Sequence, residues 1–197
     1  MQGPPAQPRR RRWLKPLIAL GILVAAPVAA FLLGIVTGTL KAYRIPSESM
    51  EPTYHVGAHV LTARRGFPFG GASRGDVVIL NPPPGALSDE CGGSHSAQQA
   101  CPAPKPGRAN VTFIKRIVAG PGDRLKILHG QVYVNGRYDD PFKVAPVQCD
   151  TCDLPTEITI PPGHWFVVGD NRANSDDSRI WGPVATGAIK GRVLFQY

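Results

Sequence analysis

The longest apolar stretch of the chain runs from residue 17 to residue 40 and holds 24 residues without a charged side chain. Folded as a helix it would rise about 36 Å, whereas the hydrocarbon core of a bilayer is about 30 Å thick. Pro27 and three glycines inside the stretch would weaken a soluble helix but are tolerated within a membrane. The pattern therefore predicts a single transmembrane anchor over residues 17–40.

Two other interpretations of this stretch stay open. One is a helix buried in a soluble core, for which 24 residues without charge are long. The other is a cleaved secretory signal, because a basic start, an apolar stretch and the small residues at 26–30 resemble its parts. The apolar part of such a signal usually has about 7–15 residues, whereas here it continues for ten positions past Ala30. We therefore expect an anchor that is not cleaved.

Beyond residue 40, short runs rich in β-branched and aromatic residues alternate with turn-forming residues, and no stretch keeps a helical period. The runs lie at 77–80, 111–118, 125–128, 132–134, 158–160, 165–168 and 193–195. Asn135-Gly136 predicts a tight hairpin turn. The 22 glycines and 21 prolines also disfavour a helix bundle. We expect a mainly β fold, with residues 41–197 as one external domain and residues 81–110 as a variable surface insertion.

Charge is distributed unevenly along the chain. The formal net charge is +8, but five positive side chains lie within residues 9–15, whereas residues 41–197 hold 17 basic and 14 acidic ones. Basic residues beside a transmembrane helix stay on the cytoplasmic side. Residues 1–16 are therefore predicted to be a cytoplasmic tail and residues 41–197 to be extracytoplasmic, in a single-pass protein of the plasma membrane. We interpret the positive charge as a determinant of the chain's orientation in the lipid bilayer, and we expect no nucleic-acid partner.

All four cysteines fall in the part predicted to lie outside, where disulfides persist. Of the three connectivities we prefer Cys91 with Cys101 and Cys149 with Cys152, because each bond closes a short local loop. A zinc knuckle or a redox pair at 149–152 is the alternative, but no second CxxC, paired histidines or thioredoxin-like βαβ pattern accompanies it. No metal site and no cofactor are predicted.

A short segment at residues 45–53 places two serines between two prolines, a few residues beyond the predicted anchor. The prolines favour an extended, rigid turn over a helix. Ser47 and Ser49 could then supply a neighbouring donor for an oxyanion and a fixed nucleophilic hydroxyl. Taken by itself, the segment could equally be an exposed linker.

The run at 111–118 contains Lys115 and Arg116, whose side chains must point to opposite faces of a strand. One cation is therefore expected to enter the interior and the other to reach solvent. A lysine acts as a base near neutral pH only when burial lowers its pKa from about 10.4, and three apolar neighbours, Phe113, Ile114 and Ile117, supply such surroundings. Two solvated cations are the alternative.

Residues 169–179, GDNRANSDDSR, form a loop with three acidic residues, two arginines and almost no apolar side chain. Such a loop needs internal hydrogen bonds and ion pairs to be ordered, and ordered polar loops on a rigid scaffold often carry functional sites. An EF-hand is excluded because the spacing and the terminal glutamate do not fit.

Together these segments resemble the characteristic boxes of bacterial type I signal peptidases, membrane-anchored serine proteases that remove signal peptides from exported proteins. The family pattern PSxSMxPT is matched at 46–53, RGDVV at 74–78, the IKR…PGD box at 114–123 and GDNRxxSxDSR at 169–179. The boxes follow in the family's order over nearly all of the external part. The insertion at 81–110, with its cysteine pair, departs from the family signature.

The resemblance implies a Ser/Lys dyad instead of a Ser-His-Asp triad. Ser49 is then the nucleophile and Lys115 the general base, while Ser47 and the Ser49 amide form the oxyanion hole. The residues expected to support the dyad, by orienting the lysine or by forming an ion pair, are Ser175, Asp177 and Arg179. None of the five histidines lies in a box, which disfavours the Ser-His arrangement of relatives in the endoplasmic reticulum.

Members of this family cleave after small residues in an Ala-x-Ala pattern and bind an extended peptide along a strand edge. The expected substrates are preprotein signal peptides, and the enzyme is expected to be a monomer. Shallow pockets for alanine-sized side chains would be lined by Tyr43, Ile45, Met50, Tyr54, Phe113 and Ile114. Phe67 and Phe69 are candidates to dip into the lipid surface, with core packing as the alternative.

Other functions are compatible with the same segments. A processing protease dedicated to a few anchored substrates, such as pilins, would use the same chemistry. A non-enzymatic anchored assembly module would keep the boxes as a scaffold, but Ser49 and Lys115 are both present. A self-cleaving transcriptional repressor shares the dyad, yet the anchor and the lack of an N-terminal DNA-binding helix pair disfavour it.

Overall fold

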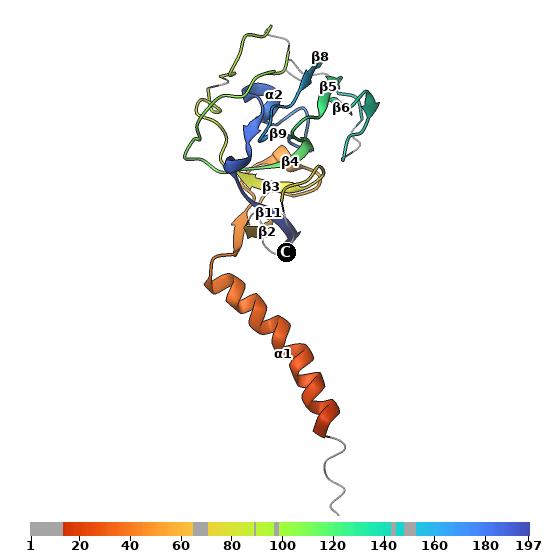
Figure 1. Ribbon diagram of the computed structural model, residues 1–197. Coiled ribbons are helices and arrows are strands. Elements are labelled where there is room, and N and C mark those ends of the chain that lie inside the picture. The colour runs from red at the N-terminus through yellow and green to blue at the C-terminus, as the bar shows by residue number, and fades with distance from the viewer. Residues whose placement is uncertain (1–13, 65–70, 89, 97–98, 143–144, 148–152) are drawn as a thin grey trace, which may run out of the picture. The chain divides into compact units, whose positions relative to one another are not determined.

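The computed structural model describes residues 14–64, 71–88, 90–96, 99–142, 145–147 and 153–197. The chain divides into two compact units that meet after Leu40. The first unit contains one long helix, and the second contains the sheets (Figure 1). The expected fold class, mainly β after a single N-terminal apolar helix, is therefore confirmed.

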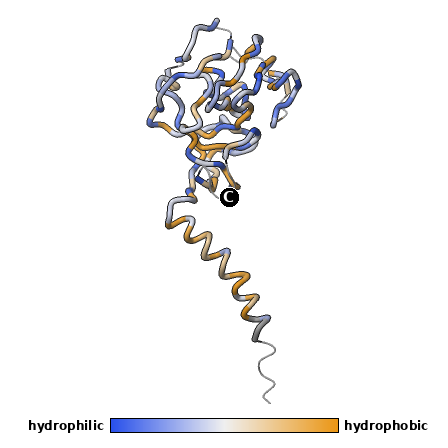
Figure 2. The backbone as a smooth tube through the Cα atoms, viewed as in Figure 1, coloured by the Kyte–Doolittle hydropathy of each residue, from blue (hydrophilic) through white to orange (hydrophobic). Residues whose placement is uncertain are grey.

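Helix α1 runs from Leu14 to Val36 and is apolar along most of its length (Figure 2). Its stretch Ile18–Val36 is long and apolar enough to cross a membrane. The helix ends four residues before the expected boundary at residue 40. Gly38 has a φ of 68°, a left-handed conformation that glycine adopts easily and that commonly ends helices. Leu40 instead begins a strand.

The larger sheet has seven strands in the order β1-β2-β11-β3-β4-β9-β10, and from β2 to β10 neighbouring strands are antiparallel. Its strands, in chain order, are β1 (Leu40–Arg44), β2 (His59–Arg64), β3 (Val77–Leu80), β4 (Phe113–Ala119), β9 (His164–Val168), β10 (Val184–Ala185) and β11 (Ile189–Gln196). Strand β11 therefore lies between the β1–β2 pair and the strands β3 and β4.

The smaller sheet has four antiparallel strands in the order β7-β6-β5-β8. They are β5 (Arg124–Leu128), β6 (Gln131–Val134), β7 (Arg137–Tyr138) and β8 (Leu154–Thr159). Leu125 and Ile127 of this sheet pack against Phe166 and Val168 of β9 in one buried core cluster. The smaller sheet is thereby fixed to the larger one.

The strands that sequence reasoning found are those with continuous apolar or aromatic runs, and each of these runs overlaps an observed strand. The predicted hairpin is present, and both Asn135 and Gly136 have positive φ, of 53° and 79°, as a two-residue hairpin turn requires. Strands β1, β2 and β10 and the one-turn helix α2 (Ser178–Trp181) were not predicted. Their sequences are short or rich in polar residues.

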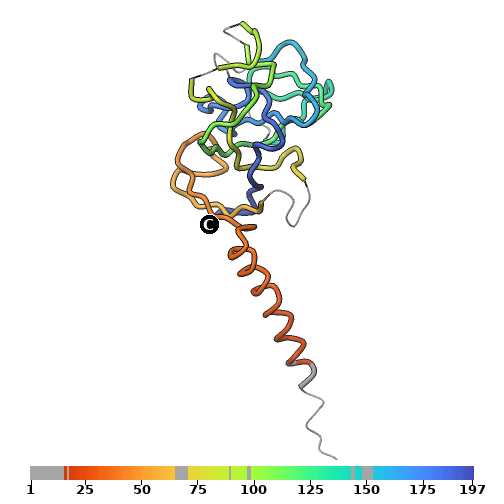
Figure 3. The backbone as a smooth tube through the Cα atoms, turned by 60° about the vertical axis from the view of Figure 1, so that its left-hand side comes forward, coloured from red at the N-terminus to blue at the C-terminus, as the bar shows by residue number. Residues whose placement is uncertain are grey.

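The segment between β3 and β4, drawn in yellow to green in Figure 3, contains the expected insertion. Its described residues contain no helix or strand. The predicted disulfide between Cys91 and Cys101 is present, with Cα atoms 5.5 Å apart. The predictions for Cys149 and Cys152, and those for Phe67 and Phe69, concern residues outside the described ones.

Candidate active site

Ser49 lies in the short 3₁₀ helix η2, Glu48–Met50, between strands β1 and β2. The sequence favoured an extended turn here instead of a helix, and the structure corrects this to a single 3₁₀ turn. Pro46 and Pro52 limit the helical conformation to that turn, because proline restricts the residue before it and cannot donate a backbone hydrogen bond. Ser49 is only 7% exposed.

Lys115 comes from strand β4, at the register position opposite Val78 of β3. Its Nζ lies 2.7 Å from Ser49 Oγ, within hydrogen-bond distance. Arg116 points to the other face, as strand alternation predicts. Arg116 does not extend into solvent as expected, however, because its guanidinium donates two hydrogen bonds of 2.7 Å to the carboxylate of Asp170.

The amine of Lys115 is almost completely buried, with 3% of the residue exposed. Burial lowers its pKa from 10.5 to about 8, although the carboxylates of Asp177, Asp176 and Asp170 act to raise it. The ring of Phe113 lies beside it, with its centroid 5.4 Å from Nζ. A large fraction of the amine is therefore neutral near pH 8, which a general base for a serine hydroxyl must be.

The second serine of the segment lies next to the first. Ser47 Oγ is 3.4 Å from Ser49 Oγ, the outer limit of a hydrogen bond. Ser47 has extended backbone angles and is exposed, so its hydroxyl is accessible to a bound peptide. This arrangement offers a donor beside the position where an oxyanion would form after attack by Ser49.

The polar loop at 169–179 holds the Ser49 turn through hydrogen bonds to its backbone. Asn171 N–H donates to Ser49 O at 3.2 Å, and Asn171 Nδ2 donates to Glu48 O at 3.2 Å. The close approach needs a glycine, because a Cβ on Gly169 would lie 2.4 Å from Ser49 O and 2.2 Å from Ser175 Oγ. The backbone of Ser49 is therefore positioned by a segment 120 residues away in sequence.

Ser175 and Lys115 line one surface groove. The Ser175 hydroxyl does not form the hydrogen bond to the lysine that the resemblance implied. Ser175 Oγ is buried and has no hydrogen-bond partner among the residues that the structure describes. The hydroxyl lies close to Gly169, so its side chain is directed at that backbone. The structure thus brings Ser175 to the site without the expected hydrogen bond.

The expected pair of Asp177 and Arg179 is present and buried. Arg179 Nε donates to Asp177 Oδ1 at 2.8 Å, and Arg179 Nη2 donates to Asp177 Oδ2 at 2.7 Å. Asp177 also caps helix α2 and accepts a hydrogen bond of 2.9 Å from Gly169 N–H. Burial raises the pKa of Asp177, but the charge and hydrogen bonds of Arg179, the charge of Lys115 and the Gly169 N–H together hold the pKa below its usual value. A buried carboxylate is thus kept charged close to Lys115.

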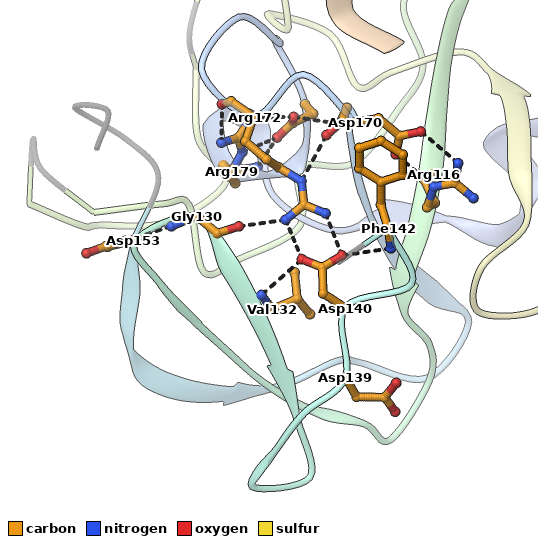
Figure 4. A network of polar contacts seen from close by, with 12 residues as sticks. Arg116, Gly130, Val132, Asp139, Asp140, Phe142, Asp153, Asp170, Arg172 and Arg179 are labelled. Carbon is orange, nitrogen blue, oxygen red and sulfur yellow. Dashed lines mark hydrogen bonds and ion pairs between the residues drawn. The ribbon is translucent and has the colours of Figure 1, made fainter. Parts of the chain in front are cut away.

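Two further Arg–Asp pairs attach the polar loop to other parts of the domain (Figure 4). Neither pairing was predicted from the sequence. Arg172 forms two hydrogen bonds with Asp140, of 2.6 and 2.7 Å, and both side chains are buried. Arg116 forms the pair with Asp170 described above, and Thr53 Oγ1 donates to that same carboxylate at 2.6 Å. These contacts connect the loop to strand β4 and to the Ser49 segment. Among the described residues, no group of three or more His, Cys, Asp or Glu side chains is placed to hold a metal ion.

A groove of about 530 Å³ runs past Ser49 and Lys115. The predicted pocket residues that line it are Tyr43, Ile45, Phe113 and Ile114. Met50 and Tyr54 do not line it. Met50 is fully buried beneath the turn in a core cluster with Val60, and Tyr54 packs against that cluster. Their predicted place in the pocket is therefore corrected, because η2 directs Met50 into the core while Ser49 borders the groove.

The family model described as "Signal peptidase, peptidase S26" matches residues 11–197. The chain belongs to this signal peptidase family. It is 31% identical over 192 residues to the probable signal peptidase I-2 of Synechocystis sp., covering 96% of this chain and 75% of that relative. It is 30% identical over 203 residues to signal peptidase I of Leptolyngbya laminosa, covering 100% of this chain and 88% of the relative.

A staphylococcal protein is also similar to this chain. Signal peptidase IB of Staphylococcus aureus is 29% identical over 185 residues, which cover 85% of this chain and 84% of that protein. Membership of the signal peptidase family makes this chain a peptidase, a hydrolase of peptide bonds, and supports signal-peptide removal as its function. The N-terminal apolar helix agrees with a membrane-anchored signal peptidase.

Proposed function

We propose that the chain is a membrane-anchored endopeptidase that removes signal peptides from exported preproteins by a Ser/Lys dyad, with Ser49 as nucleophile and Lys115 as general base. The distance of 2.7 Å between Lys115 Nζ and Ser49 Oγ carries this proposal. The lowered pKa of Lys115 and the groove that borders both side chains support it.

In the first half of the reaction, the neutral amine of Lys115 takes the proton of Ser49 Oγ while that oxygen attacks the scissile carbonyl carbon. The Ser47 hydroxyl and the Ser49 N–H donate to the negative oxygen of the tetrahedral intermediate. The C–N bond then breaks, and the Lys115 ammonium gives its proton to the leaving amine. The products are the free N-terminus of the mature protein and an ester of the signal peptide on Ser49.

In the second half, Lys115 takes a proton from a water molecule that attacks the ester. A second tetrahedral intermediate forms at the same donors and collapses, and the proton returns to Ser49 Oγ. The buried carboxylate of Asp177 limits how far the pKa of Lys115 falls, so the lysine both accepts and releases a proton near neutral pH.

Strand β1 gives the substrate a place to bind. It lies at one edge of the seven-stranded sheet, and Tyr43, Arg44 and Ile45 line the groove on its side. An exposed strand edge pairs with an extended peptide by backbone hydrogen bonds, and side-chain pockets then select alternate residues. The branched side chains of Ile45 and Ile114 line the same groove as Ser49, which supports a preference for alanine-sized side chains at the Ala-x-Ala positions.

For topology, we propose that residues 1–16 are a cytoplasmic tail, that the predicted anchor at 17–40 crosses the plasma membrane and that residues 41–197 form an extracytoplasmic, monomeric catalytic domain. The basic residues at 9–15 support this orientation. The disulfide between Cys91 and Cys101 supports an oxidising location for the domain.

The proposal is tested with the detergent-solubilised full-length chain and several unrelated purified preproteins. We expect each to be cut once, after the second alanine of an Ala-x-Ala site, as measured by mass spectrometry of the new N-terminus. A preprotein with that alanine replaced by phenylalanine should remain uncut. Cleavage of only one anchored substrate class would instead support a dedicated processing protease, and no cleavage of any preprotein would contradict the proposal.

The pH dependence of the reaction follows from the pKa of Lys115. Because the amine must be neutral to accept the proton of Ser49, kcat/KM is expected to rise with pH and to level off above a pH of about 8. The Asp176 carboxylate raises this pKa, so Asp176→Asn should move the rising part of the profile to lower pH. Asp139→Asn, which changes an exposed carboxylate paired with Arg74, is the matched control and should leave the profile in place. A profile that is flat from pH 6 to 10 would contradict the assignment of Lys115.

A further inference from the structure

The catalytic groove has one apolar wall residue that comes from the insertion. Leu87 is 68% exposed and lines the groove together with Ile79 and Phe113. A single exposed leucine is ordinary on a protein surface. Leu87, however, lies in the groove that contains Ser49 and Lys115, and it belongs to the segment that departs from the family signature.

Leu87 is exposed but its backbone is held in place. The preceding residue, Ala86, is buried in the core cluster that contains Trp181. Ser88 N–H and Glu90 N–H both donate to Gly85 O, at 2.9 and 3.2 Å, which closes a turn around Leu87. A side chain presented by a fixed turn forms part of a binding site at little entropic cost.

The insertion also contacts the segment of Asp177 and Arg179, which supports the dyad. Cys101, disulfide-bonded to Cys91, donates its N–H to Arg179 O at 2.6 Å. Gly182 lies directly against the insertion, because a Cβ there would be 2.1 Å from Ala103 O. The insertion that presents Leu87 is thus packed against helix α2, which carries Arg179. The insertion and the residues that support the dyad are therefore held together.

We propose that Leu87 is a specificity-determining residue that contacts an apolar residue of the signal peptide upstream of the cleavage site. The inference rests on the proposed function. Thr112 lines the groove directly before β4 and lies three positions before Lys115, which corresponds to about 10 Å in an extended chain. An extended substrate with its scissile bond at Ser49 therefore brings a residue about four positions upstream to this end of the groove.

The upstream direction follows from the chemistry of the substrate. A signal peptide has an apolar stretch of about 7–15 residues before its small-residue cleavage site, whereas the start of a mature protein has no fixed character. An apolar residue in the wall of this groove matches the end of that stretch. The insertion thereby adds a substrate contact to the contacts that recognise the small residues at the cleavage site.

The test uses the full-length enzyme and pairs of preprotein substrates that carry leucine or serine at one position, from the fourth to the sixth residue upstream of the cleavage site. The wild type is expected to prefer leucine at one of these positions by about tenfold in kcat/KM, the effect of burying one to two methylene groups. Leu87→Ala should reduce that preference to about twofold, and Leu87→Asp should abolish it. Val56→Ala, which shortens an exposed apolar residue outside the groove, should leave the preference unchanged.

The outcomes separate this inference from the proposed function. An unchanged leucine preference in Leu87→Ala, with Ser49→Ala inactive, overturns the role of Leu87 and leaves the dyad intact. A response confined to substrate positions downstream of the cleavage site overturns the upstream assignment. Full activity of Ser49→Ala would overturn the proposed function itself, whatever the behaviour of Leu87 variants.

Discussion

Replacing Lys115 by methionine is expected to lower kcat/KM for preprotein cleavage by about a hundredfold to ten-thousandfold, the usual contribution of a general base. Methionine has a similar length and fills the same buried site but cannot accept the proton of Ser49 Oγ. Lys115→Arg should be equally inactive, because a guanidinium does not lose its proton at any working pH. The measurement is steady-state cleavage of a purified preprotein.

The fold should survive this change, which makes the loss interpretable. A buried lysine with a lowered pKa is costly to the folded state, so Lys115→Met should be as stable as the wild type or more stable. Ser49→Ala should show a loss of the same size, and the double variant should be no worse than either single one, since two members of one catalytic unit are not additive. Lys126→Met, on strand β5 outside the groove, is the matched control and should keep full activity. Retention of a tenth of the activity in Lys115→Met would contradict its assignment as the base.

Replacing Arg172 by methionine is expected to lower the free energy of unfolding by about 3–5 kcal/mol, the usual loss when one partner of a buried ion pair is removed. The remaining Asp140 carboxylate would be buried without its cation, although Val132 N–H and Phe142 N–H still donate to it. Arg172 also donates to Gly169 O at 3.0 Å and to Gly130 O at 2.6 Å, so the loop would lose its link to the smaller sheet. Denaturant unfolding followed by tryptophan fluorescence measures the change.

A double variant separates the two causes of this loss. Arg172→Met combined with Asp140→Leu removes the unpaired charge and should recover part of the stability. Arg124→Met is the matched control, since Arg124 and Glu157 form an exposed pair with a 3.6 Å distance and should contribute less than about 1 kcal/mol. Equal effects of Arg172→Met and Arg124→Met would show that burial of the first pair does not matter.

Features that depend on local sequence could be predicted. A run of 24 residues without charge predicts a long apolar helix, which the structure contains, and Asn135-Gly136 specifies its hairpin turn by the backbone angles it allows. The alternation of Lys115 and Arg116 follows from strand geometry alone, so the burial of one of them could be expected. The pairing of Ser49 with Lys115 was predicted from the family resemblance and not from composition.

Features that depend on distant partners could not be predicted. Arg116 was expected to reach solvent, but Asp170, 54 residues later, accepts its hydrogen bonds. Arg172 pairs with Asp140 from outside the family boxes, and no local pattern marks that aspartate. Met50 looked like a pocket residue because it follows the nucleophile, yet a single 3₁₀ turn directs it into the core. Each error comes from a three-dimensional contact that a linear pattern does not contain.

The position of β11 in the large sheet makes the strand connection between the two dyad residues depend on the last described element of the chain. The turn that carries Ser49 is joined to β1 and β2, Lys115 lies on β4, and β11 lies between β2 and β3 in the sheet. Strand β11 also follows every other described element in sequence, so the ribosome delivers it after all of them. A nascent chain that has emerged only as far as Arg179 therefore contains both members of the dyad but lacks the strand that joins their halves of the sheet. The path of paired strands that joins the Ser49 turn to Lys115 through the sheet is thus complete only when β11 has been added.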